Sequence, residues 1–224
     1  VKPVTTGEGG MIVTDNEELY RKLVLYRSHG ITRDKDMMQQ YEEQLHQSSD
    51  PALQEAADML RGDVIDPGGW YYQQLELGYN YRITDISCAL GASQMDKLDR
   101  FLERRRQIAK KYEEAFADIP QIKTPWQQEG CQSGWHLYMI QTMERSRREV
   151  FDGLRQAGIG VNVHYIPVYR HPYYQRNGYA GVHCLNAEAF YERAISLPIF
   201  PGLTGQQQDY VIEHVIKECT AIRS

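Results

Sequence analysis

A lysine followed by hydroxyl residues and glycines stands at the start of the sequence. The run Val1-Lys2-Pro3-Val4-Thr5-Thr6-Gly7-Glu8-Gly9-Gly10 leads into the apolar stretch Met11-Ile12-Val13-Thr14. Glycines let a backbone approach a ligand closely, because no Cβ stands in the way. If the fold confines Lys2, desolvation favours the neutral amine, which is a nucleophile that forms Schiff bases. On local chemistry alone, the alternative is a solvated surface lysine, which is the commoner fate of such a residue.

A second run with binding chemistry is Gly78-Tyr79-Asn80-Tyr81-Arg82, which follows the aromatic run Trp70-Tyr71-Tyr72. Aromatic rings with polar tips form amphipathic surfaces that suit ligands, and a guanidinium such as Arg82 binds a phosphate through two hydrogen bonds. The alternatives are an aromatic loop that packs on a core and a structural ion pair for Arg82.

The histidines carry weaker signals. His164 lies in the alternating run Gly160-Val161-Asn162-Val163-His164-Tyr165, where a strand histidine is more often structural than catalytic. His29 precedes Gly30, and either lines an active-site mouth or, as we favour, closes a turn. The remaining histidines and the separated cysteines have no ligand spacing, so no metal site is predicted. Hydrolase, P-loop and Rossmann signatures are also missing.

The composition narrows the class of protein. A hydrophobic content of 42% with 25% charged residues is ordinary for a globular protein that buries a core. The net charge of −5 and the lack of a long basic run argue against nucleic acid as a partner. No apolar run reaches membrane-spanning length, and isolated cysteines predict buried free thiols in a reducing compartment.

The first hundred residues predict the end of a layered α/β arrangement. Residues 10–14 predict a short buried strand, and Asp15 with Glu18 forms the capping-box pattern of a helix. Residues 31–69 are polar and indicate a mobile connection or an insertion. This segment includes a short helix over about 51–61, with Asp50 as its cap. Thr84-Asp85 then caps a further helix.

The rest of the chain predicts a smaller domain. An amphipathic helix over 101–116 connects the two parts, so we place the domain boundary near residue 100. Strands are expected at 136–142, 160–165 and 195–198, and helices at 146–157, 186–193 and 204–219, the last three capped by Ser146, Asn186 and Thr204. This order predicts a small sheet covered on one face by helices, an α+β layer.

Several of these runs resemble the pyridoxal-phosphate sugar aminotransferases of the DegT/DnrJ/StrS family. The likeness is carried by residues 1–15, by Arg27-Ser28-His29-Gly30, by 78–82 and by Val163-His164-Tyr165, and it weakens only around 33–66. Within the family the chain most resembles the pseudaminic-acid branch, transaminases that make UDP-4-amino-4,6-dideoxy-N-acetyl-altrosamine. The resemblance implies a fold-type I α/β aminotransferase, with residues 1–100 ending the large cofactor-binding domain and 101–224 forming the small α+β domain.

The resemblance also implies roles for individual residues. Lys2 would carry pyridoxal 5'-phosphate as a Schiff base and, when freed, move the proton between cofactor and substrate carbons. Asn80 would reach across a dimer interface to the cofactor phosphate of the neighbouring subunit. Substrate contacts are implied for Arg82, Tyr81, His164 and Tyr165, and no metal is expected. The implied reaction moves an amino group, from glutamate, to C4 of a nucleotide-linked 4-keto-6-deoxy sugar used for surface polysaccharide or glycan precursors.

The family pattern further implies a larger, cytoplasmic homodimer with shared active sites. Family members carry many residues before this lysine, including the acidic partner of the pyridine nitrogen and the aromatic that stacks on the cofactor ring. We therefore expect a C-terminal portion that starts just before the Schiff-base lysine, or a numbering that begins late. The alternative function is that of a non-catalytic C-terminal fragment acting only in packing, dimer contact or weak ligand binding.

Overall fold

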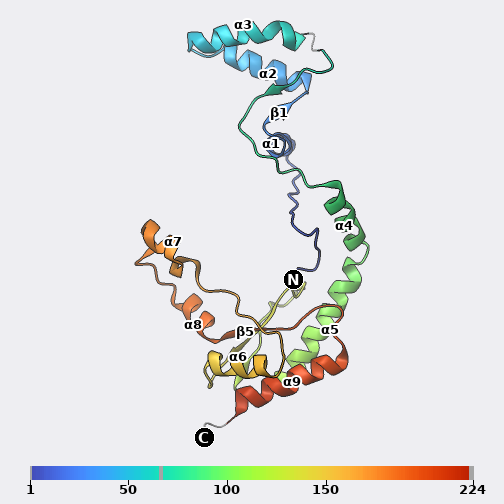
Figure 1. Cartoon of the computed structure of the whole chain (residues 1–224), viewed down its shortest axis with the longest axis vertical. Coiled ribbons are helices and arrows are strands. Elements are labelled where there is room, and N and C mark those ends of the chain that lie inside the picture. The colour runs from blue at the N-terminus through green and yellow to red at the C-terminus, as the bar shows by residue number, and fades with distance from the viewer. Residues whose placement is uncertain (1, 66–67, 222–224) are drawn as a thin grey trace. The chain divides into compact units, whose positions relative to one another are not determined.

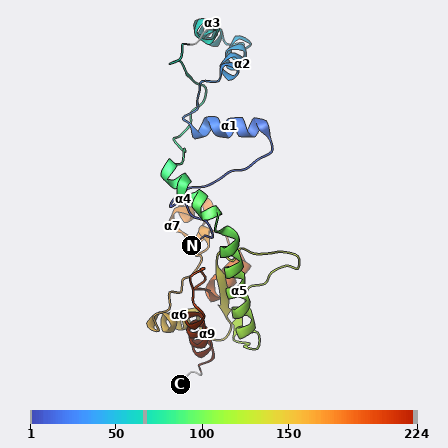
Figure 2. The same ribbon diagram turned by 90° about the vertical axis from the view of Figure 1, so that its right-hand side faces the viewer.

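The computed structural model describes residues 2–65 and 68–221. These residues form two compact units, which Figures 1 and 2 show in two views. Unit 1 contains Val1–Thr5 and Gly91–Ser224, and unit 2 contains Thr6–Leu90. The predicted boundary near residue 100 concerns the domains of a whole enzyme and stays a prediction.

Unit 2 is built from helices and one short pair of strands. Helix α1 (Glu17–Arg27) precedes strand β1 (Ile31–Thr32), which pairs antiparallel with β2 (Gln73–Gln74). Helices α2 (Lys35–His46) and α3 (Pro51–Ile65) lie side by side (Figure 1) and bury Met38, Ala57 and Val64. Helix α4 (Asp85–Met95), of which residues 85–90 belong to this unit, is capped as predicted by Thr84, whose hydroxyl accepts from the Ser87 backbone N–H at 3.2 Å.

The polar segment 31–69 is more regular than its composition suggested, although residues 66–67 lie outside the described part. The predicted helix begins at Pro51 beneath Asp50, whose carboxylate accepts from the Ala52 N–H at 2.9 Å, but it continues to Ile65. Helix α2 was not predicted. Met38 is the only buried apolar residue of α2. The helix is stabilised by packing this residue against α3, and its otherwise polar composition gave no sign of that contact.

Two expectations for the start of the chain are wrong. Residues 10–14 form no strand, and Met11 and Val13 are 87% and 84% exposed. A strand exists only by pairing, and none of the described segments pairs with this one. Helix α1 is capped by Asn16 rather than Asp15, because the Asn16 side chain accepts from the Leu19 N–H at 2.9 Å. Glu18 is consequently not the capping-box residue.

Unit 1 is an antiparallel sheet with helices packed against it. The strands β3 (Ile122–Lys123), β4 (Tyr138–Thr142) and β5 (Ala194–Leu197) pair in that order, with Tyr138 opposite Leu197. Helices α5 (Leu98–Phe116), α6 (Arg147–Gln156) and α9 (Gly205–Thr220) contribute to one core with the sheet (Figure 1). Its fully buried members include Ile108, Tyr112, Tyr138, Ile140, Val150, Leu154, Ile195 and Val215.

Most of the predicted elements of unit 1 are present. Ser146 caps α6 and Thr204 caps α9, the latter through a capping box with Gln207. Between β4 and β5 the chain forms a 3-10 turn (Val168–Arg170), the short helix α7 (Pro172–Tyr174), a wide helical turn (Gln175–Tyr179) and α8 (Leu185–Arg193).

Other expectations for unit 1 are wrong. The strand expected at 160–165 is a single bridge between Asn162 and Ser196. The helix expected to begin at Asn186 already includes Leu185, so Asn186 lies inside it.

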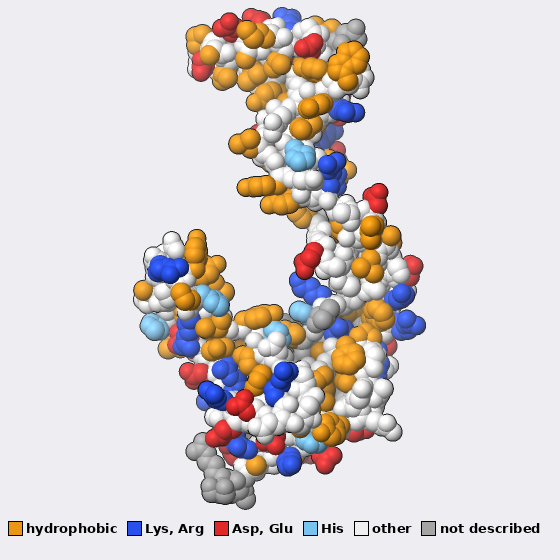
Figure 3. Space-filling view, in the orientation of Figure 1, with side chains coloured by type: hydrophobic (Ala, Val, Ile, Leu, Met, Phe, Trp, Pro, Cys, Tyr) orange, Lys and Arg blue, Asp and Glu red, His pale blue; other side chains and the backbone are white. Residues whose placement is uncertain are grey.

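Many large apolar side chains are exposed on the surface. Figure 3 shows hydrophobic side chains on the visible face of both units, and Ile86 and Leu77 are 85% and 90% exposed. Surfaces of this kind are typical of regions that contact other polypeptide. Of the cysteines, three are exposed and only Cys219 is buried, so the prediction of buried thiols holds for Cys219 alone, where burial raises the pKa to about 12. Within the described residues, no helix is both long and apolar enough to cross a membrane.

Candidate functional site

Lys2 lies on unit 1 with an exposed side chain. None of the described carboxylates forms an ion pair with its ammonium group. The next residue, Pro3, approaches Gly134 so closely that a Cβ on that glycine would lie 3.9 Å from Pro3 Cγ. The lysine run therefore lies beside the loop that enters β4. The confinement expected for Lys2 is not provided by the residues that the structure describes.

A buried arginine holds this loop in place. Arg105 of α5 is 2% exposed and donates to the carbonyl oxygens of Trp135 at 2.9 Å and Ile199 at 3.0 Å. A longer bond of 3.4 Å reaches the His136 carbonyl oxygen, and burial lowers the pKa of Arg105. Trp135 has a φ of 44°, a left-handed conformation that costs energy for a residue with a side chain. Arg105 thus stabilises a strained turn that positions His136.

His164 is fixed against the edge of the sheet. Its Nδ1 lies 2.7 Å from the Ser196 hydroxyl, and the Ser196 backbone N–H donates to the Asn162 carbonyl oxygen at 2.8 Å. The ring of Tyr165 meets the His164 ring edge-on at 4.6 Å, while the tyrosine is 72% exposed. His164 therefore has a defined orientation, and most of the Tyr165 side chain is exposed.

The two imidazoles of this region favour the neutral form. Burial lowers the pKa of His164, and burial also lowers the pKa of His136, to which the nearby positive charges of Lys2 and Arg105 contribute. The charge of His164 also contributes to lowering the pKa of His136, and Lys2, His136 and His164 all belong to unit 1. A neutral imidazole accepts and passes on a proton near neutral pH. Sequence reasoning left His136 unassigned, since only the buried Arg105 contact makes its position specific.

These pKa shifts predict that acid destabilises unit 1. Both folded-state pKa values lie below the unfolded value of about 6.5, so the unfolded chain binds more protons as the pH falls through that range. The stability present above about pH 6.5 is therefore lost as the pH drops further. Urea midpoints at pH 7.5 and 5.5 should differ more for the wild type than for a His136→Gln, His164→Gln double variant. Replacing the exposed His171 by Gln is the control, and an equal pH dependence in all three proteins would contradict this expectation.

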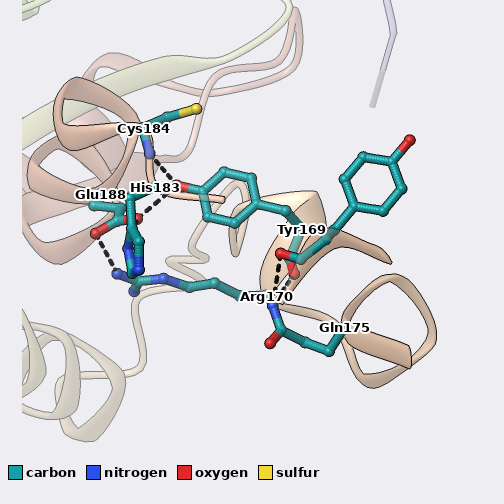
Figure 4. A network of polar contacts seen from close by, with 7 residues as sticks. Tyr169, Arg170, Gln175, His183, Cys184 and Glu188 are labelled. Atoms are coloured by element: carbon teal, nitrogen blue, oxygen red, sulfur yellow. Dashed lines mark hydrogen bonds and ion pairs between the residues drawn. The ribbon is translucent and has the colours of Figure 1, made fainter. Parts of the chain in front are cut away.

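The connection after His164 and Tyr165 is anchored by a carboxylate (Figure 4). Glu188 of α8 accepts from the Tyr169 hydroxyl at 2.9 Å, from Arg170 Nη2 at 2.9 Å and from His183 Nδ1 at 3.3 Å. The hydrogen bond from Tyr169 makes the largest contribution to lowering the pKa of Glu188, and the charge of Arg170 makes the next largest lowering contribution. The Tyr169 hydroxyl also accepts from the Cys184 N–H at 3.2 Å. This network ties the irregular segment to α8.

In unit 2, two of the motifs dock against each other through their backbones. The Tyr81 N–H donates to the Arg27 carbonyl oxygen at 2.9 Å, and the His29 N–H donates to the Tyr79 carbonyl oxygen at 3.0 Å. The glycines permit the approach: a Cβ on Gly30 would lie 1.8 Å from the Glu76 carbonyl oxygen, and one on Gly78 would lie 2.5 Å from Gly30 N. His29 closes the turn after α1 with a φ of 63°, the reading that the sequence favoured.

The predicted ligand-binding residues of unit 2 are exposed on this docked pair. Ser28 forms an antiparallel bridge with Asn80, and Arg82 Nε donates to Asn80 Oδ1 over a long 3.5 Å. The ring of Tyr81 stacks on Tyr79 with 5.3 Å between centroids. The structure thus places Asn80, Tyr81 and Arg82 on unit 2 and Lys2, His164 and Tyr165 on unit 1, where His164 contacts Tyr165. In the described part of the chain, no group of three or more histidines, cysteines and acids is placed to hold a metal.

The fold of the chain is that of solved aminotransferases. The aminotransferase PseC of Helicobacter pylori, involved in the biosynthesis of pseudoaminic acid, superposes with a TM-score of 0.78 at 27% identity. The match covers 97% of this chain and 50% of that protein. The chain is accordingly an α/β protein of the fold-type I aminotransferase class and corresponds to about half of such a structure.

Sequence comparison points to the same group. The spore coat polysaccharide biosynthesis protein SpsC of Bacillus subtilis is 36% identical over 96% of the chain and 50% of its own length. The UDP-4-amino-4,6-dideoxy-N-acetyl-beta-L-altrosamine transaminase of Campylobacter jejuni is 36% identical over 88% of the chain and 44% of its length. The chain spans about half the length of the curated relatives it matches. A family model matches residues 1–216, and the chain belongs to the DegT/DnrJ/EryC1/StrS aminotransferase family.

Proposed function

We propose that this chain carries the Schiff-base lysine of a pyridoxal-phosphate-dependent sugar aminotransferase. The enzyme transfers an amino group, from glutamate, to C4 of a nucleotide-linked 4-keto-6-deoxy sugar in the biosynthesis of polysaccharide or glycan precursors. Family membership supports the aminotransferase class, and the names of the relatives support a sugar nucleotide as the substrate class. The observation that carries the proposal is the exposed amine of Lys2, which forms no ion pair with the described carboxylates and contributes to lowering the pKa of His136 on the same unit.

The described residues fit parts of the cofactor. Pyridoxal phosphate requires a primary amine that reaches its aldehyde, and Lys2 supplies an accessible one. Its phosphate requires hydrogen-bond donors, and the exposed Asn80 amide supplies these on unit 2. When bound, pyridoxal phosphate acts as an electron sink for the carbon that loses a proton.

The chain's own residues then have distinct tasks. Lys2 would hold the cofactor through its amine, and the same amine would take up and return the proton that the reaction moves. His164, oriented by Ser196, and Tyr165 contact the sugar hydroxyls, while Arg82 and Tyr81 contact the substrate on the side of its phosphates. Asn80 would donate to the phosphate of a cofactor held by the neighbouring subunit, as the family resemblance implies, and the enzyme is on this proposal a homodimer. The homodimer and the cytoplasmic location rest on the family resemblance and stay predictions.

Lys2 is predicted to be the selective site of covalent labelling by pyridoxal phosphate. The purified chain is incubated with pyridoxal phosphate and reduced with borohydride, and the adduct is located by peptide mass spectrometry. We expect the Lys2→Ala variant to lose the adduct on the peptide position of Lys2, because the ε-amine that would form it is removed. Lys123→Ala removes an exposed lysine of the same unit and should leave the adduct unchanged. Labelling spread evenly over the lysines would instead favour the non-catalytic fragment.

A further inference from the structure

Residues 165–184 form a lobe that is attached to the rest of unit 1 at both ends. The chain leaves the edge of the sheet at His164, whose Nδ1 lies 2.7 Å from the Ser196 hydroxyl, and it returns through α8 into β5. Between these points lie the 3-10 turn Val168–Arg170, α7 and the wide helical turn (Figure 1). The lobe, α8 and β5 all belong to unit 1, so their contacts are contacts within one unit.

Glu188 of α8 closes the base of this lobe (Figure 4). Its carboxylate accepts from the Tyr169 hydroxyl and from Arg170 Nη2, both at 2.9 Å. The Glu188 side chain is only 15% exposed, and hydrogen bonds to a charged group are stronger than those between neutral groups. The Tyr169 hydroxyl also accepts from the Cys184 N–H at 3.2 Å. The first turn of the lobe and its last residue are therefore held at one point.

The part of the lobe beyond this point has contacts of its own. The Gln175 side-chain amide donates to the Tyr169 carbonyl oxygen. The ring of Tyr174 meets the ring of Tyr179 edge-on, with 5.7 Å between the centroids. Neither contact involves Glu188, so loss of the Glu188 carboxylate should shift the lobe as a body rather than unfold it.

Tyr165 lies between the two points of attachment. It follows His164 directly, and the buried Pro167 precedes the 3-10 turn, whose first backbone bond reaches the Pro167 carbonyl oxygen at 2.8 Å. A proline has a fixed φ and a hydrogen-bonded turn a fixed backbone, so only Ile166 separates Tyr165 from a rigid segment. A shift of Tyr169 is therefore transmitted to the Tyr165 ring, which meets the His164 ring at 4.6 Å and 83°.

We propose that Glu188 is a positioning residue, which sets the Tyr165 ring relative to His164 for contact with the sugar of the substrate. It acts through Tyr169 and the 3-10 turn and does not itself touch the substrate. This assignment rests on the proposed function, which gives Tyr165 and His164 their contacts with the sugar. His164 is held independently by Ser196, so Glu188 decides the place of the second ring of the pair.

Nuclear magnetic resonance of the full chain, labelled with isotopic histidine, tests this coupling. The His164 ring signal is assigned with His164→Gln, and Tyr165→Leu gives the shift that follows from removing the neighbouring ring. Because an edge-to-face pair depends on its geometry, we expect Glu188→Ala to produce at least about half of the Tyr165→Leu shift. Glu192→Ala removes an exposed glutamate of the same helix and should leave the His164 signal unchanged.

Two further variants identify the path of the coupling. Tyr169→Phe keeps the ring and removes only the hydroxyl, so it should shift the His164 signal in the same direction as Glu188→Ala. Glu188→Gln keeps an acceptor for Tyr169 but loses the charge that pairs with Arg170, so its shift should be smaller. A purely structural role would lower the urea midpoint without moving the His164 signal of the folded protein, so stability is measured for every variant.

Two results would contradict this role of Glu188. An unchanged His164 signal in Glu188→Ala, or a shift no larger than that of Glu192→Ala, overturns the proposal. If Glu188→Ala alters the circular dichroism spectrum, Tyr169→Phe decides, and an unchanged His164 signal in that variant overturns it. The resonance experiment needs neither cofactor nor substrate, whereas borohydride labelling of Lys2 tests the proposed function. A shifted His164 signal in a chain that forms no selective Lys2 adduct would keep the coupling and refute the proposed function separately.

Discussion

The Arg105→Met variant is expected to lose about 3 kcal/mol of unfolding free energy, because two buried carbonyl groups lose their donor. Arg105 donates to Trp135 and Ile199 from a side chain that is 2% exposed. Methionine replaces the apolar stem but not the N–H groups, so the carbonyl oxygens remain away from water without a partner. Urea unfolding followed by far-ultraviolet circular dichroism measures the loss.

Arg148→Met provides the matched control for this prediction. The Arg148 side chain is 91% exposed, and its ion pair with Asp152 spans 3.6 Å. Its removal should change stability by less than about 0.5 kcal/mol. If both variants unfolded at the same urea concentration, Arg105 would not stabilise the turn at Trp135. A selective loss for Arg105→Met should also broaden the resonances of His136, whose position depends on that turn.

The Gly30→Ala variant is expected to separate the two docked motifs of unit 2. The new Cβ would lie 1.8 Å from the Glu76 carbonyl oxygen, so the backbone has to move. Gly30 also has a φ of 68°, a conformation that costs an L-residue about 1–2 kcal/mol. We expect amide hydrogen exchange at His29 and Tyr81 to accelerate at least about tenfold, since both N–H groups bond across the contact.

Gly62→Ala tests whether the effect depends on position. Gly62 lies inside α3, and a Cβ there would meet no atom within 4 Å. Alanine favours a helix interior over glycine by about 0.5–1 kcal/mol, so this variant should stabilise the α2–α3 pair slightly. Unchanged exchange at His29 and Tyr81 in Gly30→Ala would show that the close approach at Gly30 does not hold the two motifs together.

Local chemistry was readable from the sequence where a few neighbouring residues decide the outcome. The caps at Ser146 and Thr204 were predicted correctly because a cap depends on a hydroxyl and the next three residues. The predicted cap of α1 was wrong by one residue, because Asp15 and Asn16 are adjacent polar residues that can both cap a helix, and Asn16 does so. The family and the chemistry expected at Lys2 were likewise present in the runs of residues themselves.

Tertiary structure decided every feature that depends on distant partners. Residues 10–14 have the composition of a strand, yet they remain exposed because strand pairing requires a neighbour that composition does not reveal. The burial of Arg105 is explained only by its contact with the Trp135 and Ile199 carbonyl groups, which lie 30 and 94 residues away in the sequence. The turn after α1 likewise meets the 72–82 segment through the close backbone approach of Gly30 and Gly78. The sequence by itself determined the residue types and the local turns, whereas these long-range contacts became visible only once the chain was folded.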